Sequence, residues 1–382
     1  MALDNETLTL LLDAVRRFVA ERLVPAEDEL ASTGIMPEGI VDEMRELGLF
    51  GLSIAPEYGG LGLNMEEEVN VVFELGQTSP AFRSLAGTNI GIGSQAIVLA
   101  GTEAQRANYL PRLASGELVG AFALTEPEAG SDAMSLRTTA VRDGDHYVLN
   151  GTKRFITNAP IAGLFSVMAR TSSERSADAI SCFLVEAGTP GLTLGKPDKK
   201  MGQAGALTCD VVFDNCRVPA DSLLGGQEGT GFRTAMRVLD KGRLHISALC
   251  VGIAERLVRD ASRYALERKQ FGQPIADFQL VQAMLADSQA ERYAARCMVL
   301  DAARKRDRGE NTTLEAACCK LYATEMVGRV ADRAVQIHGG AGYMAEYAVE
   351  RFYRDVRLFR IYEGTSQIQQ LVIARETLKA YR

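Results

Sequence analysis

One glutamate stands in an unusual position near the end of the chain. Glu363 lies in the stretch RIYEGTSQIQ (360–369), between a tyrosine and a glycine, and the segments on both sides have helical patterns. Apolar residues precede it and Thr, Ser and Gln follow it, which indicates a buried carboxylate beside a polar ligand. Burial raises the pKa of a carboxyl group and makes its ionised form a stronger base. The pattern predicts a base for a weakly acidic C–H proton, with a helix cap or a solvated side chain as the alternative.

Two earlier stretches contain residue types that are suited to line a binding site for a planar ligand. LTEPEAGSD (124–132) contains small and hydroxyl-bearing residues, which allow close backbone approach and hydrogen bonds. In RFITN (154–158), Phe155 and Thr157 are two positions apart in a predicted strand and are expected to point to the same face. That face would stack on a ring system. A turn with a helix cap, and an ordinary core aromatic, are the structural alternatives.

Two further stretches combine charge or glycine with helix ends. RKQFG (268–272) places a basic pair between two predicted long helices, where Arg offers a forked donor for a pyrophosphate and solvated charge is the alternative. QIHGGAGY (336–343) breaks a helix with three glycines, which frees backbone N–H groups for a ligand. It is not a GxGxxG after a strand, so a Rossmann dinucleotide site is excluded. His338 within it is expected to pack rather than to react.

The elements that must position these residues begin with helices. Apolar positions from Leu8 onward have the spacing of an amphipathic helix. Further helices are predicted at residues 37–49, 65–78, 89–101 and 103–116.

The sequence changes character near Gly120. As far as Pro219 the segments are short, rich in β-branched and aromatic residues, and separated by turns. Asp143-Gly144 and Asn150-Gly151 each predict a hairpin, because a type I′ turn requires positive φ at both central residues. With no long helix between the strands, the sheet is expected to be antiparallel and barrel-like or sandwich-like.

Helical patterns return after about Gly229 and continue to the end of the sequence. The lengths are those of long bundle helices, predicted at 230–268, 275–308, 312–339 and 344–382. The predicted fold class is therefore α+β and multidomain. It comprises an N-terminal helical domain (1–119), a middle antiparallel β-barrel-like domain (120–228) and a C-terminal four-helix bundle (229–382).

Composition narrows the classes of partner. The net charge of -7 argues against a nucleic-acid partner, and no apolar run of about 18 residues predicts a membrane span. The start of the chain has neither a secretory signal nor a transit-peptide pattern, so a cytoplasmic location is expected. The seven cysteines contain no CxxC pair and the three histidines have no metal-ligand spacing, so free thiols and no metal site are expected.

The motifs LTEPEAGSD, FITN, ERKQFG, QIHGGAGY and IYEGTSQIQ occur in the order found in one known family. In this order they resemble the acyl-CoA dehydrogenase family over essentially the whole chain. The resemblance implies that fold, a homotetramer, one FAD per subunit and α,β-desaturation of an acyl-CoA thioester. It also implies electron-transfer flavoprotein as the acceptor.

The resemblance gives Glu363 its role. In the family the matching glutamate removes the α-proton of the thioester while a hydride passes from the β-carbon to flavin N5. The thioester carbonyl is polarised by the backbone N–H of the same glutamate and a ribityl hydroxyl of the flavin. Some branches carry the base just before the arginine of the LDKGRL segment, and this chain has Gly242 there. Glu363 is thus the one candidate base.

The resemblance also assigns ligand contacts by motif. Contacts to the flavin ring are implied for Phe122, Leu124, Thr125, Gly130, Ser131, Phe155 and Thr157. Contacts to the FAD of a neighbouring subunit are implied for Arg268, Gln270, Phe271, Gln279, Gln336, Ile337, Gly339 and Gly340, and adenosine contacts for Thr365 and Gln367. Substrate contacts are implied for Asp240 and Arg243 at the CoA moiety, Ser131 nearby, and Tyr362 and Gly364 beside the thioester.

Arg83 bears on the acyl chain. It lies in SPAFRS, at the start of a small and apolar helix, and is similar to an arginine of the glutaryl-CoA dehydrogenase branch that meets the distal carboxylate of the substrate. A desulfinase branch also has an arginine near this place. The sequence therefore admits a short or dicarboxylyl acyl chain, with a surface arginine paired to a glutamate as the alternative. For His245, packing is favoured over a place in the pocket.

Other functions on the same fold remain open at this point. One is a lyase that expels a β-substituent such as sulfinate, although the desulfinase branch lacks the glutamate. Another is an oxidase that uses oxygen, although typical acyl-CoA oxidases are longer than 382 residues. A non-catalytic binding protein is disfavoured because the cofactor and base motifs are intact.

Overall fold

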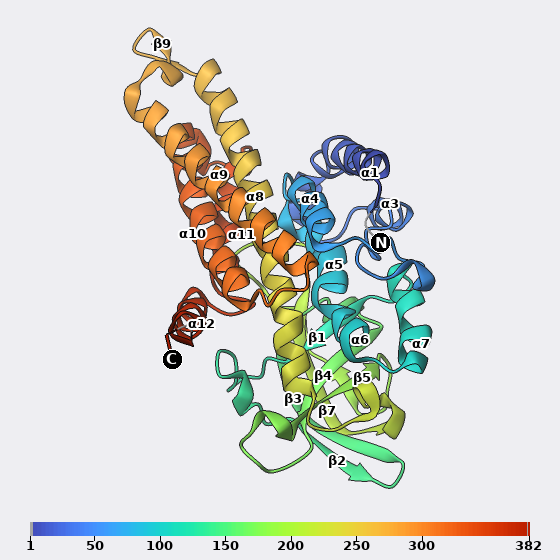
Figure 1. Ribbon diagram of the computed structural model, residues 1–382. Helices are drawn as coiled ribbons and strands as arrows, with labels where there is room; N and C mark the ends of the chain where they lie inside the picture. Colours follow the sequence, from blue (N-terminus) through green and yellow to red (C-terminus); the bar gives the residue numbers. More distant parts are fainter. Residues whose placement is uncertain (1–2, 380) are drawn as a thin grey trace.

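The computed structural model describes residues 3–379 and 381–382. A helical part, a β part and a helical bundle follow one another along the chain (Figure 1). The N-terminal helices are α1 (Asn5–Phe18), α2 (Glu27–Thr33), α3 (Ile40–Glu46), α4 (Met65–Leu75), α5 (Pro80–Thr88), α6 (Gln95–Ala100) and α7 (Glu103–Ala114).

Local signals explain where several of these helices begin. Asn64 and Glu67 form a reciprocal capping box at the start of α4, and Thr102 and Gln105 do the same for α7. The predicted helices at 65–78 and 103–116 are confirmed. The predicted 89–101 helix is instead a π-helical turn, Asn89–Gly93, followed by α6. The helix expected to begin near Arg83 is α5, and α2 was not predicted.

The middle part is a single curled sheet. Its strands are β1 (Gly120–Ala123), β2 (Thr139–Asp143), β3 (His146–Thr157), β4 (Leu164–Arg170), β5 (Ile180–Glu186), β6 (Leu192–Leu194) and β7 (Thr208–Pro219). Within the described chain the order is β1-β4-β2-β3-β7-β6, with β5 beside β4. Most pairs are antiparallel as expected, but β1 and β4 pair in parallel. The chain reverses at β3 and again at β4, so β4 runs in the direction of the earlier strands.

One of the two predicted hairpins is wrong. The hairpin predicted at Asp143-Gly144 is confirmed between β2 and β3, but of its two central residues, Gly144 and Asp145, only Gly144 has positive φ, so the turn is not of type I′. Asn150-Gly151 lies inside β3, at a register shift against β7. A Cβ atom at Gly151 would come within 2.5 Å of Thr138 Oγ1, so the glycine serves a close approach of backbone and not a turn.

The bundle is built on α8 (Gly231–Glu267), α9 (Gln279–Asp307) and α10 (Thr313–His338). The fourth predicted helix is wrong, because residues 344–382 divide into α11 (Ala348–Val356), a 3₁₀ turn at Arg357–Arg360 and α12 (Ser366–Lys379). The small hairpin of β8 (Lys269–Gln270) and β9 (Gln273–Pro274) stands at the far tip of the bundle (Figure 1).

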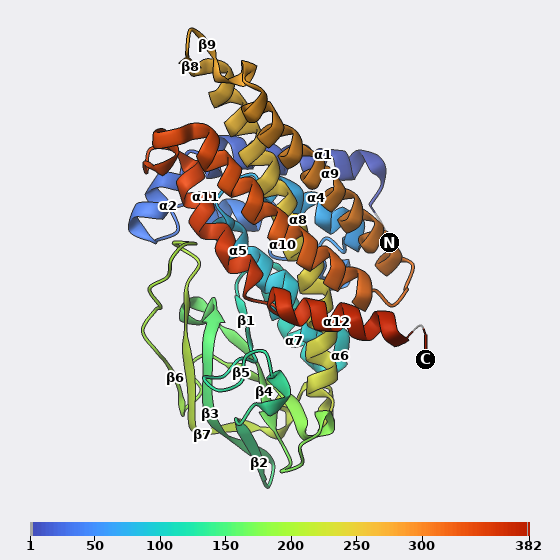
Figure 2. The same ribbon diagram turned by 90° about the vertical axis from the view of Figure 1, so that its left-hand side faces the viewer.

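Helix α8 connects all parts of the fold. It has 37 residues, which corresponds to about 55 Å, and it passes from the sheet past α4 to the tip of the bundle (Figure 2). Its central residues are buried in one apolar core with α4, α9 and α10. In the range 3–379, none of the helices combines the length and apolar character that a bilayer crossing requires.

Candidate active site

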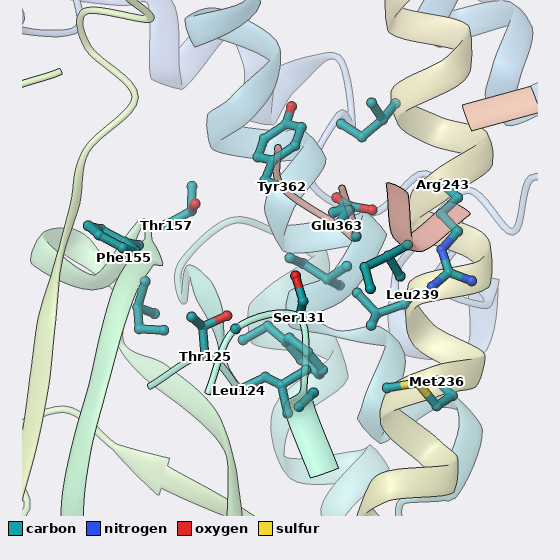
Figure 3. A pocket seen from close by; sticks show the side chains of 18 of the residues that line it. Leu124, Thr125, Ser131, Phe155, Thr157, Met236, Leu239, Arg243, Tyr362 and Glu363 are labelled. Carbon is teal, nitrogen blue, oxygen red and sulfur yellow. The ribbon is translucent and has the colours of Figure 1, made fainter. Parts of the chain in front are cut away.

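A cavity of about 470 Å³ lies between the sheet, the first half of α8 and the turn that precedes α12 (Figure 3). The sequence-predicted residues that line it are Arg83, Phe122, Leu124, Thr125, Gly130, Ser131, Phe155, Thr157, Arg243, Tyr362, Glu363 and Gly364. They come from five separate segments of the chain, so the fold brings together the motifs predicted to surround the flavin ring, the predicted base and Arg83.

The turn at Glu363 has a strained backbone. Glu363 has φ of 53° and Gly364 has φ of 90°, and the left-handed region costs a non-glycine residue about 1–3 kcal/mol. Lys320, which is fully buried, donates from Nζ to the Gly364 carbonyl at 2.6 Å. Gln369 donates from Nε2 to the carbonyls of Glu363 and Gly364, both at 3.1 Å. These two side chains hold the turn that replaces a continuous helix.

The carboxylate of Glu363 points across the cavity toward α8 (Figure 3). Its Oε2 atom is buried and has no hydrogen-bond partner among residues 3–379. Burial raises the pKa of Glu363, and the cations Arg83, Lys320 and Arg243 partly offset this rise. A buried carboxylate whose oxygen is left free is suited to accept a proton from a bound ligand.

A glycine on α8 provides the space for this carboxylate. A Cβ atom at Gly242 would lie 2.3 Å from Oε2 of Glu363. Any side chain at position 242 would therefore displace the carboxylate. The family resemblance allows a base at position 242 or at position 363, and these two positions face the same space from opposite walls of the cavity.

The sheet forms the other wall. Phe155 and Thr157 both line the cavity, but not through regular alternation: Phe155 has φ of 58° at a register shift in β3 and is 58% exposed. The neighbouring Arg154 donates from its backbone N–H to the Thr125 carbonyl at 2.8 Å. The bulge thereby joins β3 to the segment after β1.

A buried ion pair supports that segment from behind. Lys153 is fully buried and donates from Nζ to Glu126 at 2.7 Å and to the Leu124 carbonyl at 3.2 Å. Burial lowers the pKa of Lys153 to about 8 against the opposing effect of Glu126. With the hydroxyls of Thr125 and Thr157 and an exposed phenyl ring on one wall, the donor set fits a planar heteroaromatic group.

Arg83 is not a surface arginine paired with a glutamate. It is 5% exposed, and its Nη2 lies within hydrogen-bond distance of His245 Nδ1. His245 Nε2 lies 2.6 Å from Glu68 Oε1, and Lys241 Nζ lies 3.0 Å from Glu68 Oε2. His245 is fully buried behind the cavity wall, where it makes specific hydrogen bonds in addition to packing contacts.

Other predicted site residues are not brought to the cavity within one chain. Asp240 pairs with Arg243 at 2.6 Å and accepts from Thr313 Oγ1 at 2.9 Å. Thr365 Oγ1 accepts from the N–H of Ile368 at 3.2 Å in the first turn of α12. The positions predicted to reach a second FAD lie near the β8–β9 tip or at the end of α10; they are Arg268, Gln270, Phe271, Gln279, Gln336, Ile337, Gly339 and Gly340.

Sequence reasoning predicted Arg243 but missed the apolar residues of α8 that line the cavity. Met236, Leu239 and Ile246 line it together with Arg243. The positions 236, 239, 243 and 246 follow the spacing of one helix face, so the signal was present in the sequence. Periodicity alone does not distinguish a face that covers a core from one that lines a cavity.

Comparisons with known proteins agree with this architecture. Family models match the chain in three consecutive parts. They are the acyl-CoA dehydrogenase N-terminal domain at residues 5–117, the middle domain at 121–216 and the C-terminal domain at 229–378.

Curated relatives match over nearly the whole length. Acryloyl-CoA reductase (NADH) of Anaerotignum propionicum is 44% identical over 372 residues, which cover 97% of this chain and 94% of the relative. A subunit of the caffeyl-CoA reductase–Etf complex of Acetobacterium woodii is 40% identical over 371 residues, covering 97% and 98%.

Solved structures have the same fold over nearly the whole chain. Butyryl-CoA dehydrogenase from Megasphaera elsdenii superposes with a TM-score of 0.95 at 37% identity and covers 99% of both chains. A glutaryl-CoA dehydrogenase in complex with glutaryl-CoA gives a TM-score of 0.94 at 35% identity and covers 99% of this chain and 96% of that chain.

Fold and comparisons together define an oxidoreductase of α–β–α architecture. The chain belongs to the acyl-CoA dehydrogenase family. Its cofactor is FAD and its reaction acts on the CH–CH bond of an acyl-CoA thioester.

Proposed function

We propose that this protein interconverts an acyl-CoA and its α,β-enoyl-CoA, with Glu363 as the base that removes the α-proton. The observation that carries this proposal is the free, buried Oε2 of Glu363 on a strained turn that faces the cavity. When bound, FAD supplies the acceptor for a hydride from the β-carbon.

The residues of the chain assist proton removal in two ways, by stabilising the developing charge of the thioester and by keeping the base ionised. The N–H of Glu363 makes no backbone hydrogen bond within the described chain, which leaves it available to the thioester carbonyl as charge develops on that oxygen. Arg83, Lys320 and Arg243 favour the ionised form of Glu363 against the effect of burial. Tyr362 and Gly364 flank the thioester, and Ser131, Asp240 and Arg243 contact the CoA moiety.

We also propose that two subunits complete each FAD site, in a homotetramer. Phe122, Leu124, Thr125, Gly130, Ser131, Phe155 and Thr157 would hold the flavin ring of their own subunit. Along α8 the distance from Arg243 to the tip is about 36 Å, so the tip is too far away to serve its own cavity. Phe271 and Leu280 at the tip are 94% and 82% exposed, as expected for residues that a second copy covers.

The remaining assignments follow the family pattern. Thr365 and Gln367 are proposed to reach the adenosine moiety.

Domain limits at 119/120 and 228/229 are supported by the separate family matches. A cytoplasmic location is supported by the free state of the seven cysteines.

The electron partner is proposed to be an electron-transfer flavoprotein. One relative is a subunit of a complex with such a protein, and the relatives named reductases work on unsaturated thioesters. The reductive direction is therefore a second candidate function for the same site. It is tested by adding an enoyl-CoA to dithionite-reduced protein without oxygen: reoxidation supports it, and no reoxidation by any enoyl-CoA removes it.

The substrate is proposed to carry an anionic group at the far end of a short acyl chain. Arg83 is a buried cation on the cavity wall, and the partner of its guanidinium is a neutral imidazole. Burial of a charge without an opposite charge is costly, and a ligand anion would offset that cost.

An anaerobic screen of flavin bleaching tests both parts of the proposal. Glutaryl-CoA, succinyl-CoA and butyryl-CoA are added to purified protein and the flavin spectrum is followed. Bleaching by at least one thioester is expected, fastest with a dicarboxylyl thioester. If no acyl-CoA bleaches the flavin, the reaction is wrong; if butyryl-CoA is the faster substrate, the anionic tail is wrong.

A further inference from the structure

Arg83 and Glu363 on the cavity wall form no ion pair among residues 3–379, whereas the neighbouring carboxylates of Glu68 and Asp240 are paired. Glu68 pairs with Lys241 at 3.0 Å and Asp240 pairs with Arg243 at 2.6 Å. For Arg83, no carboxylate among residues 3–379 forms an ion pair, and its Nε lacks a hydrogen-bond partner.

The partner of Arg83 is a histidine whose hydrogen bonds fix its state. A guanidinium can only donate, so Nδ1 of His245 must accept from Arg83 and Nε2–H must donate to Glu68. Burial lowers the pKa of His245 to about 4, and Arg83 and Lys241 lower it against the opposing effect of Glu68. The imidazole is therefore neutral near pH 7.

A second line of contacts anchors this histidine. Glu68 is held by Lys241, and Lys241 Nζ also donates to Ser53 Oγ at 2.6 Å. The negative charge of Glu68 is thus matched by Lys241. His245 is hydrogen-bonded to Glu68 on one side and to Arg83 on the other, so it fixes the position of Arg83. Because its ring is neutral, it places no negative charge beside the guanidinium.

We propose that His245 is a positioning residue that presents Arg83 to the substrate as a cation without an ion-pair partner and thereby sets a preference for acyl-CoA thioesters with an anionic acyl terminus. A carboxylate in the place of the imidazole would hold the guanidinium equally well but would neutralise it. An apolar residue would leave the charge but not the orientation. This inference rests on the proposed function, because it requires that the acyl chain reaches Arg83.

The experiment compares glutaryl-CoA with its neutral analogue, the monoamide of glutaryl-CoA, through kcat/KM and through the dissociation constant from flavin spectral changes. In His245→Leu the anionic-to-neutral ratio is expected to fall about tenfold, mostly through the KM of glutaryl-CoA, since one buried partner of a charged group is lost. His245→Gln offers both an acceptor and a donor and is expected to restore most of the ratio. Ser247→Ala, a buried change one turn along α8 from Arg243, is the matched control and is expected to leave the ratio unchanged.

A double-mutant cycle with Arg83→Met separates the possible outcomes. Arg83→Met is expected to lower the ratio about 100-fold, and His245→Leu is expected to change nothing further in that background. If the anionic-to-neutral ratio is unchanged in Arg83→Met, the proposal of an anionic acyl terminus is wrong. A fall in Arg83→Met with no fall in His245→Leu overturns only the role of His245. Where His245→Leu does not yield yellow, folded protein, His245→Asn carries the same test, because its side chain is too short to reach both partners.

Discussion

Two buried carboxylates in this protein have opposite surroundings. Glu27, at the junction of the N-terminal helices and the bundle, accepts from Thr78 Oγ1 at 2.8 Å and from the Ser79 N–H at 3.0 Å. It also pairs with Arg351 at 2.8 Å and with Arg256 at 3.3 Å. Both of its oxygens are occupied, whereas Oε2 of Glu363 is buried and free in the described chain.

The difference distinguishes a carboxylate that stabilises the fold from one that is available to react with a ligand. A buried charge whose hydrogen bonds are all made within the protein locks two parts of a fold together, because removing any partner leaves another group uncompensated. A buried charge with a free atom is available to a ligand. The free-energy cost of burying it is offset by favourable interactions elsewhere in the fold. Each of the following predictions tests one side of this contrast.

The largest effect is expected from Glu363→Gln. The amide keeps the shape of the side chain but is not a base, so the rate of flavin reduction by the best acyl-CoA is expected to fall about 10⁴-fold. Stopped-flow absorbance without oxygen measures the rate, and the FAD content of the purified protein is the control. Native-rate bleaching in this variant would show that another residue is the base.

Glu27→Gln is expected to damage stability and not chemistry. Two buried arginines would face a neutral amide, which is expected to lower the free energy of unfolding by about 3 kcal/mol. Urea denaturation followed by circular dichroism measures this loss. Flavin reduction in the folded variant is expected at the native rate, and a large drop in that rate would contradict the separation of the two roles.

Gly242→Ala tests whether the free oxygen needs its space. The methyl group would displace Oε2 of Glu363, which it would approach to 2.3 Å, and flavin reduction is expected to slow about 100-fold. Stability is expected to change little, since alanine favours a helix and the displaced atom ends a flexible side chain. Gly252→Ala on the same helix is the contrast: its Cβ would lie 2.3 Å from the Phe73 carbonyl, so it is expected to destabilise the fold instead.

Lys320→Met is expected to have the smallest effect, visible mainly in the pH dependence. Lys320 lowers the pKa of Glu363, so its loss raises that pKa further. The base is active when ionised, and the acidic limb of the flavin-reduction rate is therefore expected to move to higher pH, with the largest loss of rate on the acidic side of the profile. Arg83 on α5 and Arg243 on α8 still face the carboxylate in the variant. Lys320→Arg keeps the charge and is expected to shift the limb less; equal shifts would assign the effect to lost packing.

The sequence predicted the order of the three parts and the break in the helix at Glu363, because both are encoded in local patterns. It failed at Asn150-Gly151, where the requirement for glycine comes from Thr138 in another part of the sheet. It also did not predict that α11 ends at Val356 and is followed by a 3₁₀ turn at Arg357–Arg360, before the predicted break at Glu363.

The environment of Arg83 lay beyond any local pattern. Glu68, Arg83 and His245 come from three helices that are separated by as many as 177 positions in the chain. Their meeting is decided by the packing of α4 and α5 on α8, which single-sequence periodicity does not describe. Residue type alone left both outcomes for Arg83 open, and its burial excludes the surface ion pair with a glutamate.

The length of α8 has a further consequence. Its first half lines the cavity and its far end carries the tip, so a single uninterrupted rod fixes the distance and the angle between the two. Adding one residue between Ile246 and Glu267 would rotate everything beyond it by about 100° and advance it by about 1.5 Å. An insertion in this part of α8 would therefore misplace the tip relative to the cavity, and with it the contacts that the tip is proposed to make with the FAD of a second subunit.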